Sequence, residues 1–540
     1  MDVSPPQLRS AAWTLALAAV LLLALGLRLH GIHDPMLDHP GWRQGDTAAI
    51  ARNFARLQFN PMYPQTTYNG PPPNYVELEL QIVPFVAASL YKVFGIHEVF
   101  GRLVSLAFSL ATLTTLAYFA RWLFGSAAAG IIAGFFYAIF PGSVYYGRTF
   151  MPESAMVFFL TIALYAASRY LVEDPSLSLR GLAWPTALLA LAYLAKPVAM
   201  LAVAPLLGLT WERARAGRRM RFWPLAVLLV LPALLFWLYD RRVASYAEWH
   251  WASGITRLHV LPALRAGLTS LAGFTAKFEQ FRVVLGMLRE TLVGQIPFLL
   301  TIGGFIALPW IKARSKALLW CWLAGGLIYI YVVVTVERVD YYMYPLLPLC
   351  AIAIGGGLAR LIAGLRGVDA APPVRYALLG LVALVCLAAL WESRGPVAAY
   401  YDYSKPVYRN AVYLDRALPK NSLIVIGHYG PDVQYYIDRF GWEEDPMLWT
   451  PFDEESAIRK GARYFISIED DRLRHNIELC AWLQRFPVID GGARWPVYET
   501  DPAKIVPGAE RLWRAFRNAE RAGAARVFLD AHGLCRVTGA

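Results

Sequence analysis

The sequence has little charge and little cysteine, and it lacks common nucleotide-binding motifs. Only 17% of its 540 residues are charged, whereas 57% are hydrophobic, and the mean hydropathy is +0.40. This composition is far too apolar for an ordinary soluble domain. The polar C-terminal part contains neither GxGxxG nor a P-loop, so we predict no nucleotide chemistry there.

The five cysteines show no metal-ligand spacing. Cys321, Cys350 and Cys386 fall inside apolar runs, whereas Cys480 and Cys535 lie in the polar tail. A disulfide between the last two and a pair of free thiols are equally weighted alternatives. The net charge of +12 does not indicate nucleic acid, because many arginines flank apolar runs and are typical of membrane topology.

What the sequence has instead is a series of apolar runs of roughly 17 to 25 residues, the length that crosses a bilayer. The first has no small-residue cleavage site and is predicted to be a retained signal anchor. A shorter run, 80–94, is predicted to lie at the membrane surface. We predict an α-helical polytopic membrane protein with about eleven transmembrane helices, at 11–30, 102–121, 127–147, 153–171, 181–195, 197–211, 222–239, 292–311, 317–335, 342–363 and 375–391.

Lysine and arginine orient these helices, because short cytoplasmic loops carry an excess of both. Five arginines lie between 213 and 221, and further cations lie within 312–316 and 360–375. If 80–94 does not cross the bilayer, all three loops are cytoplasmic. The first outer loop, 31–101, which is predicted to contain interfacial helices, and the long loop, 240–291, then face the outside.

From about residue 392 the composition becomes polar. Short apolar runs at 422–427, 463–468 and 495–499 predict strands, and helical patterns lie between and after them. We therefore predict a transmembrane module over 1–391, followed by a small extracytoplasmic α/β domain over 392–540.

The predicted topology brings polar residues from several segments to the outer face. Each has a structural alternative. Asp46 could cap an interfacial helix, Glu153 could be a first-turn acid, and Lys196 could snorkel from a turn. Tyr341 and Tyr342 could belong to an aromatic belt. Their convergence on one face favours a functional site.

At these residues the sequence resembles the C-type glycosyltransferase superfamily, in the bacterial branch similar to protein mannosyltransferases and the lipid A aminoarabinose transferase. The resemblance implies transfer of a sugar from a polyprenyl-phosphate donor to an envelope acceptor, at the outer face of a bacterial inner membrane. It implies Asp46 as general base and Glu153 as the second acidic position. The first loop lacks the adjacent acidic pair of eukaryotic protein mannosyltransferases. The matching segments are WRQGDTAAIARNF (42–54), Glu79 ahead of YKVFG, GRTFMPES (147–154), AKP (195–197) and DYYMYPLLP (340–348).

The chemistry of such a transfer agrees with these residue types. A base must take the acceptor's hydroxyl proton, and cations must stabilise the departing phosphate. We expect inversion by a single displacement, without a general acid. The predicted phosphate ligands are Lys196, Arg148, Arg338, Tyr341 and Tyr342, with Arg257 and Arg265 as weaker candidates, and the predicted acceptor or sugar ligands are Glu79, Arg43 and Asp340. Two acids and a phosphate could recruit a divalent cation, but we predict no metal and no cofactor.

Three other functions fit parts of the pattern. A transporter or lipid flippase would need polar groups through the depth of the membrane, whereas these gather at one face. A polysaccharide ligase or polymerase would use a similar lipid-linked donor, typically with a pyrophosphate link. A membrane-anchored binding protein would leave the charged outer face unexplained.

Overall fold

The computed structural model describes residues 6–217, 222–367, 372–489, 495–521, 523, 526–529 and 535–538. The chain forms two compact units. Residues 1–33 and 77–401 form the first, which we call the helical unit. Residues 34–76 and 402–540 form the second, the mixed unit. This division differs from the predicted domains, because most of the first outer loop groups with the C-terminal residues.

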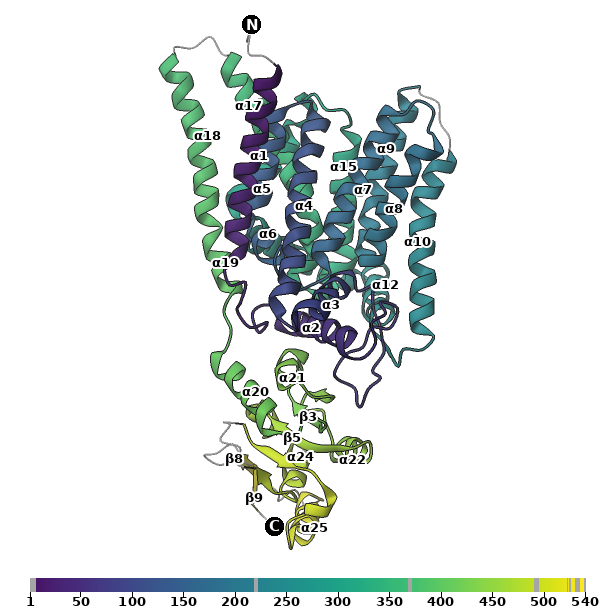
Figure 1. Cartoon of the computed structure of the whole chain (residues 1–540), viewed down its shortest axis with the longest axis vertical. Helices are drawn as coiled ribbons and strands as arrows, with labels where there is room; N and C mark the ends of the chain where they lie inside the picture. The colour runs from purple at the N-terminus through teal and green to yellow at the C-terminus, as the bar shows by residue number, and fades with distance from the viewer. Residues whose placement is uncertain are drawn as a thin grey trace. The chain divides into compact units, whose positions relative to one another are not determined.

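The helical unit is a bundle of long helices that run up and down side by side (Figure 1). α1 begins, and α9 and α17 end, at the upper end of this bundle, whereas α3, α12 and α19 lie at its lower end. The principal helices are α1 (Pro6–Leu29), α3 (Ile82–Phe94), α4 (Glu98–Phe124), α5 (Ala127–Ile139), α6 (Pro141–Tyr146), α7 (Glu153–Glu173), α8 (Leu179–Ala195), α9 (Val203–Arg215), α10 (Phe222–Ala244), α12 (Leu261–Thr269), α13 (Leu271–Met287), α14 (Gln295–Ala307), α15 (Ala317–Tyr329), α17 (Leu347–Gly367), α18 (Pro372–Glu392) and α19 (Arg394–Tyr400).

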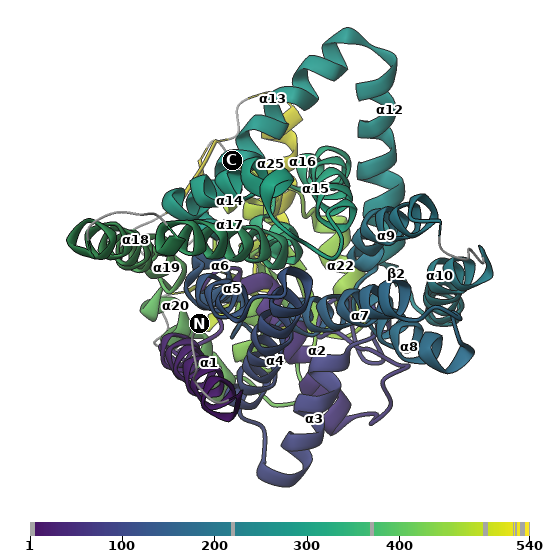
Figure 2. The ribbon, with the colours of Figure 1, turned by 90° about the horizontal axis from the view of Figure 1, so that it is seen from above.

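Short elements join these helices. Seen from above, α17 lies within the bundle and α18 at its periphery (Figure 2). The most apolar part of the span Asp340–Leu365 is 67% buried, whereas that of the span Pro372–Tyr400 is 6% buried. The connecting elements are β1 (Val76–Glu77), within which the chain passes from one unit to the other, η1 (Pro197–Ala202), β2 (Trp249–His250), α11 (Trp251–Gly254), η2 (Ile255–Val260), η3 (Leu288–Val293), η4 (Leu308–Trp310), η5 (Ile330–Val334), α16 (Thr335–Glu337) and η6 (Asp340–Leu346).

Seven helices in the described ranges are long and apolar enough to cross a membrane, or eight if one bent pair is a single span. The structure thus does not give eleven continuous helices. The predicted spans 127–147, 181–195 and 197–211 correspond to helices of 13, 17 and 13 residues. The predicted span 292–311 belongs to the pair that bends by 109°. Apolar runs report hydrophobic length, whereas proline and glycine decide where a helix breaks.

The break between α5 and α6 shows how such an interruption is stabilised. Pro141 has no N–H, so it cannot donate to the carbonyl of Tyr137 four residues earlier. The fully buried guanidinium of Arg28 donates to that carbonyl at 3.3 Å and to the carbonyl of Ala138 at 3.1 Å. Arg28 also donates to the hydroxyl of Ser143 at 2.7 Å. This buried cation therefore satisfies the carbonyl oxygens at the break.

α3 has 13 residues and is followed by Gly95, whose φ of 86° favours glycine. At 1.5 Å per residue it is about 20 Å long, whereas the hydrocarbon core of a bilayer is about 30 Å thick. α3 is therefore too short to cross a membrane. This length agrees with the predicted surface location of 80–94.

The mixed unit contains a five-stranded sheet in the order β4-β3-β5-β7-β6. β3 is parallel to β4 and β5, and β7 is antiparallel to β5 and β6. The runs at 422–427, 463–468 and 495–499 correspond to β3, β5 and β7, whereas β4 carried no signal in the sequence. The strands are β3 (Leu423–Gly427), β4 (Gly441–Glu444), β5 (Ala462–Ser467), β6 (Val488–Ile489), β7 (Val497–Glu499), and the separate hairpin β8 (Arg526–Leu529) and β9 (Cys535–Thr538).

Helices cover both faces of this sheet, because successive side chains along a strand point to opposite faces. Ile424 and Ile426 pack with residues of α20 and α21, whereas Val425 packs with residues of α22 and α24. Cys480 is disulfide-bonded, and the side chain of Cys535 lies outside the described residues. The helical elements of the mixed unit are α2 (Gly41–Arg56), α20 (Lys405–Ala417), α21 (Pro431–Ile437), α22 (Pro451–Arg459), α23 (Asp470–Leu473), α24 (Ile477–Leu483), η7 (Pro502–Lys504) and α25 (Ala509–Arg521).

The predicted orientation can be tested by cysteine labelling. His33 and Ala216 are exposed and lie in segments that we predict to be outside and cytoplasmic, respectively. In intact cells, we expect a membrane-impermeant maleimide to label His33→Cys, and to label Ala216→Cys only after permeabilisation. The native chain serves as the background control, because three of its cysteines lie in apolar helices and Cys480 is disulfide-bonded. Labelling of both variants from the same side would contradict the topology.

Candidate functional site

Lys196 is the centre of a buried cluster in the helical unit. Its backbone is extended (φ −169°, ψ 131°) at the end of α8, because the ring of Pro197 clashes with a helical conformation of the residue before it. Its amine forms a salt bridge with Glu153, the first residue of α7. The same nitrogen lies 5.2 Å from the ring centroid of Tyr341 and 4.8 Å from that of Tyr342. We call Glu153, Lys196, Tyr341 and Tyr342 the Lys196 cluster.

Burial excludes two of the structural alternatives for these residues. Lys196 is 8% exposed and paired, so it does not snorkel to the surface. Tyr341 is 1% exposed, so it is not an aromatic-belt residue. Glu153 is indeed a first-turn acid of α7, but its Oε2 atom has no hydrogen-bond partner in the described part of the chain. A buried cation beside a half-satisfied carboxylate is suited to exchange partners with an incoming anion.

Asp340 fixes the segment that carries the two tyrosines. Its Oδ1 atom accepts hydrogen bonds from the hydroxyl of Tyr146 at 2.7 Å and from the backbone N–H of Tyr341 at 2.8 Å. Its Oδ2 atom accepts one from the hydroxyl of Tyr400. These contacts join α6 and α19 to η6. The structure therefore gives Asp340 contacts that orient Tyr341.

The two predicted arginines near this cluster differ in accessibility. Arg148 is fully buried, donates to the carbonyl of Gly31 at 3.0 Å, and lies over the rings of Tyr145 and Tyr401 at 5.0 and 4.4 Å. A phosphate could reach it only after these contacts were broken. Arg338 is exposed and has a left-handed backbone with φ of 51°.

Glu79 precedes Leu80, whose backbone contacts the end of α8. The N–H of Leu80 donates to the carbonyl of Leu194 at 2.8 Å, and Glu79 itself is 5% exposed. Two residues earlier, Glu77 is fully buried. It accepts a hydrogen bond from Ser253 at 2.9 Å, and its Oε2 atom lies 3.3 Å from Nδ1 of His250. Residues of the segment 240–291, the predicted long outer loop, therefore contact Glu77.

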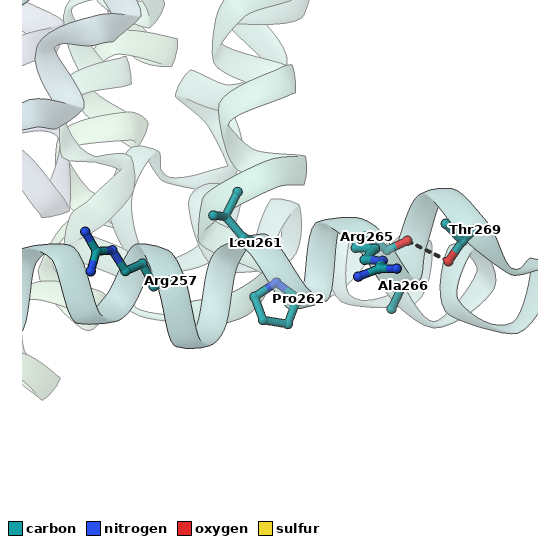
Figure 3. Close-up of a pocket in the computed structure, with 6 residues that line it drawn as sticks. All are labelled: Arg257, Leu261, Pro262, Arg265, Ala266 and Thr269. Carbon is teal, nitrogen blue, oxygen red and sulfur yellow. Dashed lines mark hydrogen bonds between the residues drawn. The ribbon is translucent and has the colours of Figure 1, made fainter.

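The weaker phosphate candidates lie on one exposed segment of the helical unit. Arg257 belongs to η2 and Arg265 to α12, and both line an open groove (Figure 3). Thr269 donates to the carbonyl of Arg265 at 2.8 Å. These elements differ from those that carry the Lys196 cluster, which are α7, the end of α8 and η6.

Asp46 and Arg43 lie on α2, in the mixed unit. α2 begins at Gly41, and its N-cap residue is Pro40. Asp46 is therefore in the interior of the helix, and the alternative that it caps the helix is wrong. Asp46 is 6% exposed, its Oδ2 atom lies 3.9 Å from Nη1 of Arg43, and it also accepts a hydrogen bond from Tyr68.

α2 is held within the mixed unit by the C-terminal residues. A Cβ atom at Gly45 would lie 2.5 Å from Cα of Asp432, so this face of α2 must be bare to contact α21. Arg52 donates to the carbonyl of Tyr435 at 2.8 Å and forms a salt bridge with Asp438 at 2.9 Å. The helix that carries Asp46 thus packs against α21 and the residue that follows it.

Electrostatics in this part of the mixed unit are set by burial and by neighbouring acids. Burial, the charges of Asp46 and Glu443, and the hydrogen bond to Asp46 raise the pKa of Tyr68 well above its ordinary value. Burial and the charges of Asp46, Asp432 and Glu444 likewise raise the pKa of Glu443 well above its ordinary value. Nothing in the sequence marked Glu443, because its proximity to Asp46 depends on the tertiary fold.

Both the sequence and the structure of this chain are similar to those of known proteins. A family model described as dolichyl-phosphate-mannose-protein mannosyltransferase matches residues 81–239. The apo oligosaccharyltransferase of Archaeoglobus fulgidus has a TM-score of 0.60 at 13% identity, over 88% of this chain and 73% of that chain. ArnT of Cupriavidus metallidurans bound to undecaprenyl phosphate has a TM-score of 0.57 at 13% identity, over 92% and 99%. No curated protein matches the sequence significantly.

The fold is that of the C-type glycosyltransferases. The predicted resemblance to protein mannosyltransferases and to ArnT is therefore confirmed. Archaeoglobus fulgidus AglB, in complex with an inhibitory peptide and a dolichol-phosphate, is a further structure with this fold, with a TM-score of 0.57 at 13% identity over 91% of this chain and 74% of that chain.

Within this C-type glycosyltransferase fold, the predicted residues fall into two groups. Glu153, Tyr341 and Tyr342 surround Lys196 in the helical unit, and Asp340 supports the segment that carries the tyrosines. Asp46 and Arg43 belong to the mixed unit. In the described ranges, no group of three or more histidine, cysteine, aspartate or glutamate side chains could hold a metal ion.

Proposed function

We propose that the protein is a membrane glycosyltransferase that transfers a hexosyl or pentosyl unit from a polyprenyl-phosphate donor to an envelope acceptor. The acceptor is a lipid, a glycan or a protein. Transfer takes place on the extracytoplasmic face of a bacterial inner membrane, and the C-terminal domain lies on the same side. The observation that carries this proposal is the Lys196 cluster, a buried cation with an acid and two tyrosines, in a C-type glycosyltransferase fold.

The proposed mechanism is a single displacement. Asp46 takes the proton of the acceptor hydroxyl while the acceptor oxygen attacks the anomeric carbon. The bond from this carbon to the phosphate oxygen breaks, and the electron pair leaves with the polyprenyl phosphate. One proton is released for each sugar transferred. Because attack and departure occur on opposite sides of the carbon, the anomeric configuration inverts.

The other residues bind the donor and the acceptor. Lys196 stabilises the departing phosphate, because a desolvated ammonium interacts strongly with a developing anion. Tyr341 and Tyr342 donate hydrogen bonds to the phosphate or contact the sugar, and Arg338 is an accessible second cation. Glu153 holds Lys196 in the absence of donor and then contacts sugar hydroxyls. Glu79 and Arg43 are the acceptor ligands.

A transfer assay with a defined donor tests this function. Purified protein in detergent or proteoliposomes is given polyprenyl-phosphate sugars of known anomeric configuration and a lipid extract of the envelope. We expect a glycosylated product whose anomeric configuration is opposite to that of the donor, as measured by the proton coupling constant in NMR spectra. Retention of configuration would contradict a single displacement.

Mass spectrometry of envelope glycans, from cells with and without the protein, identifies the acceptor. We expect one glycan, lipid or glycoprotein to lose a sugar residue when the protein is absent. An unchanged set of envelope glycans, together with movement of an intact lipid-linked saccharide across vesicles, would favour a flippase instead.

A further inference from the structure

Glu443 of β4 is a buried acid for which the folded domain offers few compensating contacts. It is 8% exposed. One of its oxygens accepts a hydrogen bond from the backbone N–H of Gly430, but its Oε2 atom has no partner in the described part of the chain. A buried carboxyl group of this kind costs stability, and its presence calls for a reason.

The first outer loop lies directly along the strand that carries Glu443. The N–H of Gly441 donates to the carbonyl of Thr67 at 3.1 Å, and the N–H of Gly70 donates to the carbonyl of Gly441 at 2.7 Å. A Cβ atom at Gly70 would lie 3.3 Å from the ring of Trp442. Residues 67–70 are thus fixed to the strand at its first two residues, next to Glu443.

Tyr68 lies within this fixed segment. It is 3% exposed and donates a hydrogen bond to Asp46. Gly45, the residue before Asp46, contacts Asp432 at the start of α21 through its bare face. The proposed base is therefore buried beside groups that belong to, or are fixed by, the C-terminal residues.

We infer that Glu443 is a positioning residue for Asp46: it carries the single proton of a buried carboxyl pair, so that the negative charge stays on Asp46. This inference rests on the proposed function and extends it, because it makes the C-terminal domain part of the proton chemistry. Two buried carboxylates close together cannot both remain ionised without cost. Glu443 has an unpartnered oxygen on which to hold the proton.

The charges around Glu443 favour this arrangement. The groups that act on Glu443 or on its neighbour Tyr68 include three other carboxylates, those of Asp46, Asp432 and Glu444, and one cation, Arg43. Burial and these negative charges raise the pKa of Glu443 well above its ordinary value of 4.5, and the charge of Asp46 contributes most among them. The titratable groups concerned are Asp46 and Arg43 of α2, Tyr68 of the first loop, Tyr429 between β3 and α21, Asp432 of α21 and Glu444 of β4.

The test compares Glu443→Gln with a matched control, Glu454→Gln. Glu454 is a fully buried acid of the same unit whose pKa burial raises to about 8, and it accepts a hydrogen bond from the indole of Trp449 at 2.7 Å. Both substitutions replace a buried acid by a neutral amide, but the neighbouring charge that raises the pKa of Glu454 is that of Asp453 and not that of Asp46. A general effect of neutralising a buried acid would appear in both variants.

We expect kcat of the native chain to fall roughly tenfold at alkaline pH, once Glu443 ionises and repels Asp46 from its working orientation. Glu443→Gln mimics the protonated acid. It should therefore match the native kcat near neutral pH within about threefold, keep the same donor KM, and lack the alkaline fall. Glu454→Gln should retain the fall. An alkaline fall that persists in Glu443→Gln, or is missing from the native chain, overturns the inference.

A second measurement does not depend on transfer. Between pH 4.5 and its raised pKa, Glu443 binds more proton in the folded than in the unfolded chain, so its contribution to stability is lost as pH rises through that window. We expect Glu443→Gln to have a higher melting temperature than the native chain, and we expect this difference to grow as the pH rises. The difference should be smaller when both chains also carry Asp46→Asn. An equal difference with and without Asp46→Asn overturns the pairing of Glu443 with Asp46.

These measurements separate failure of the inference from failure of the proposed function. If Asp46→Asn abolishes transfer but the Glu443 variants behave as the native chain does, only the role of Glu443 is wrong. If Asp46→Asn transfers sugar at the native rate, the proposed base itself is wrong. The melting temperatures of the native chain, the two single variants and the double variant Asp46→Asn/Glu443→Gln then still decide whether Glu443 and Asp46 share a proton.

Discussion

Asp46→Asn is expected to reduce the rate of sugar transfer by about 10²- to 10⁴-fold, the usual contribution of a positioned general base. Asparagine has nearly the same shape as aspartate and can accept the hydrogen bond from Tyr68, but it cannot take a proton from the acceptor. The fold of α2 should be preserved, because Asp46 is interior to the helix and does not cap it. Initial rates at saturating donor and acceptor measure the effect.

Asp38 provides a matched control for this substitution. It lies in the same loop, is fully buried, and accepts a hydrogen bond from Gln44 at 2.7 Å. The carbonyl oxygen of asparagine can accept the same bond, so Asp38→Asn should transfer sugar at close to the native rate. Equal losses in both variants would point to damage of the first loop rather than to a missing base. Native activity in Asp46→Asn would remove Asp46 from the mechanism.

Much of the helical arrangement was accessible from the sequence, because hydrophobic length and charge are local properties. Runs such as 102–121 and 153–171 correspond to the long helices α4 and α7. The exact number of spans was not accessible. Pro141, Pro197 and Gly294 interrupt helices inside or between apolar runs, and whether an interruption separates two spans or bends one depends on neighbours such as Arg28.

The part of the candidate site around Lys196 was predictable, because its residues lie in short sequence motifs. Glu153 opens a helix, Lys196 precedes a proline, and two tyrosines follow Asp340. Such patterns place polar groups at helix ends, where the structure brings them into contact. The sequence could not show that Asp340 is bound by Tyr146 and Tyr400, because these tyrosines are distant in the chain.

The grouping of residues 34–76 with the C-terminal domain was also beyond the sequence. It depends on non-local contacts, such as the salt bridge between Arg52 and Asp438 and the backbone bridge between Gly70 and Gly441. A loop and a distant domain reveal no pairing through composition or periodicity. The same reason explains why Glu443 was not recognised, although it lies on a strand close to the proposed base.

Lys196→Met tests the proposed phosphate ligand, and its interpretation requires a second substitution. Removing the lysine alone leaves Glu153 buried without its cation, which is expected to cost about 3 to 5 kcal/mol of stability. The double variant Lys196→Met/Glu153→Gln removes both charges and should recover most of this stability. Thermal unfolding in detergent measures the difference between the single and the double variant.

These substitutions should affect donor binding differently from stability. A charge-assisted contact to phosphate is worth about 1.5 to 3 kcal/mol, so the dissociation constant for polyprenyl phosphate should rise roughly 10- to 150-fold. This weakening should persist in the double variant, although its stability is restored. Lys277→Met is the matched control, because Lys277 is buried beneath the ring of Tyr331 but donates to that residue's carbonyl and to Thr335. Two outcomes would show that Lys196 does not bind the phosphate: native donor affinity in the double variant, or an equal loss of affinity in Lys277→Met. The pairing of Lys196 with Glu153 would then serve only to join α7 to α8.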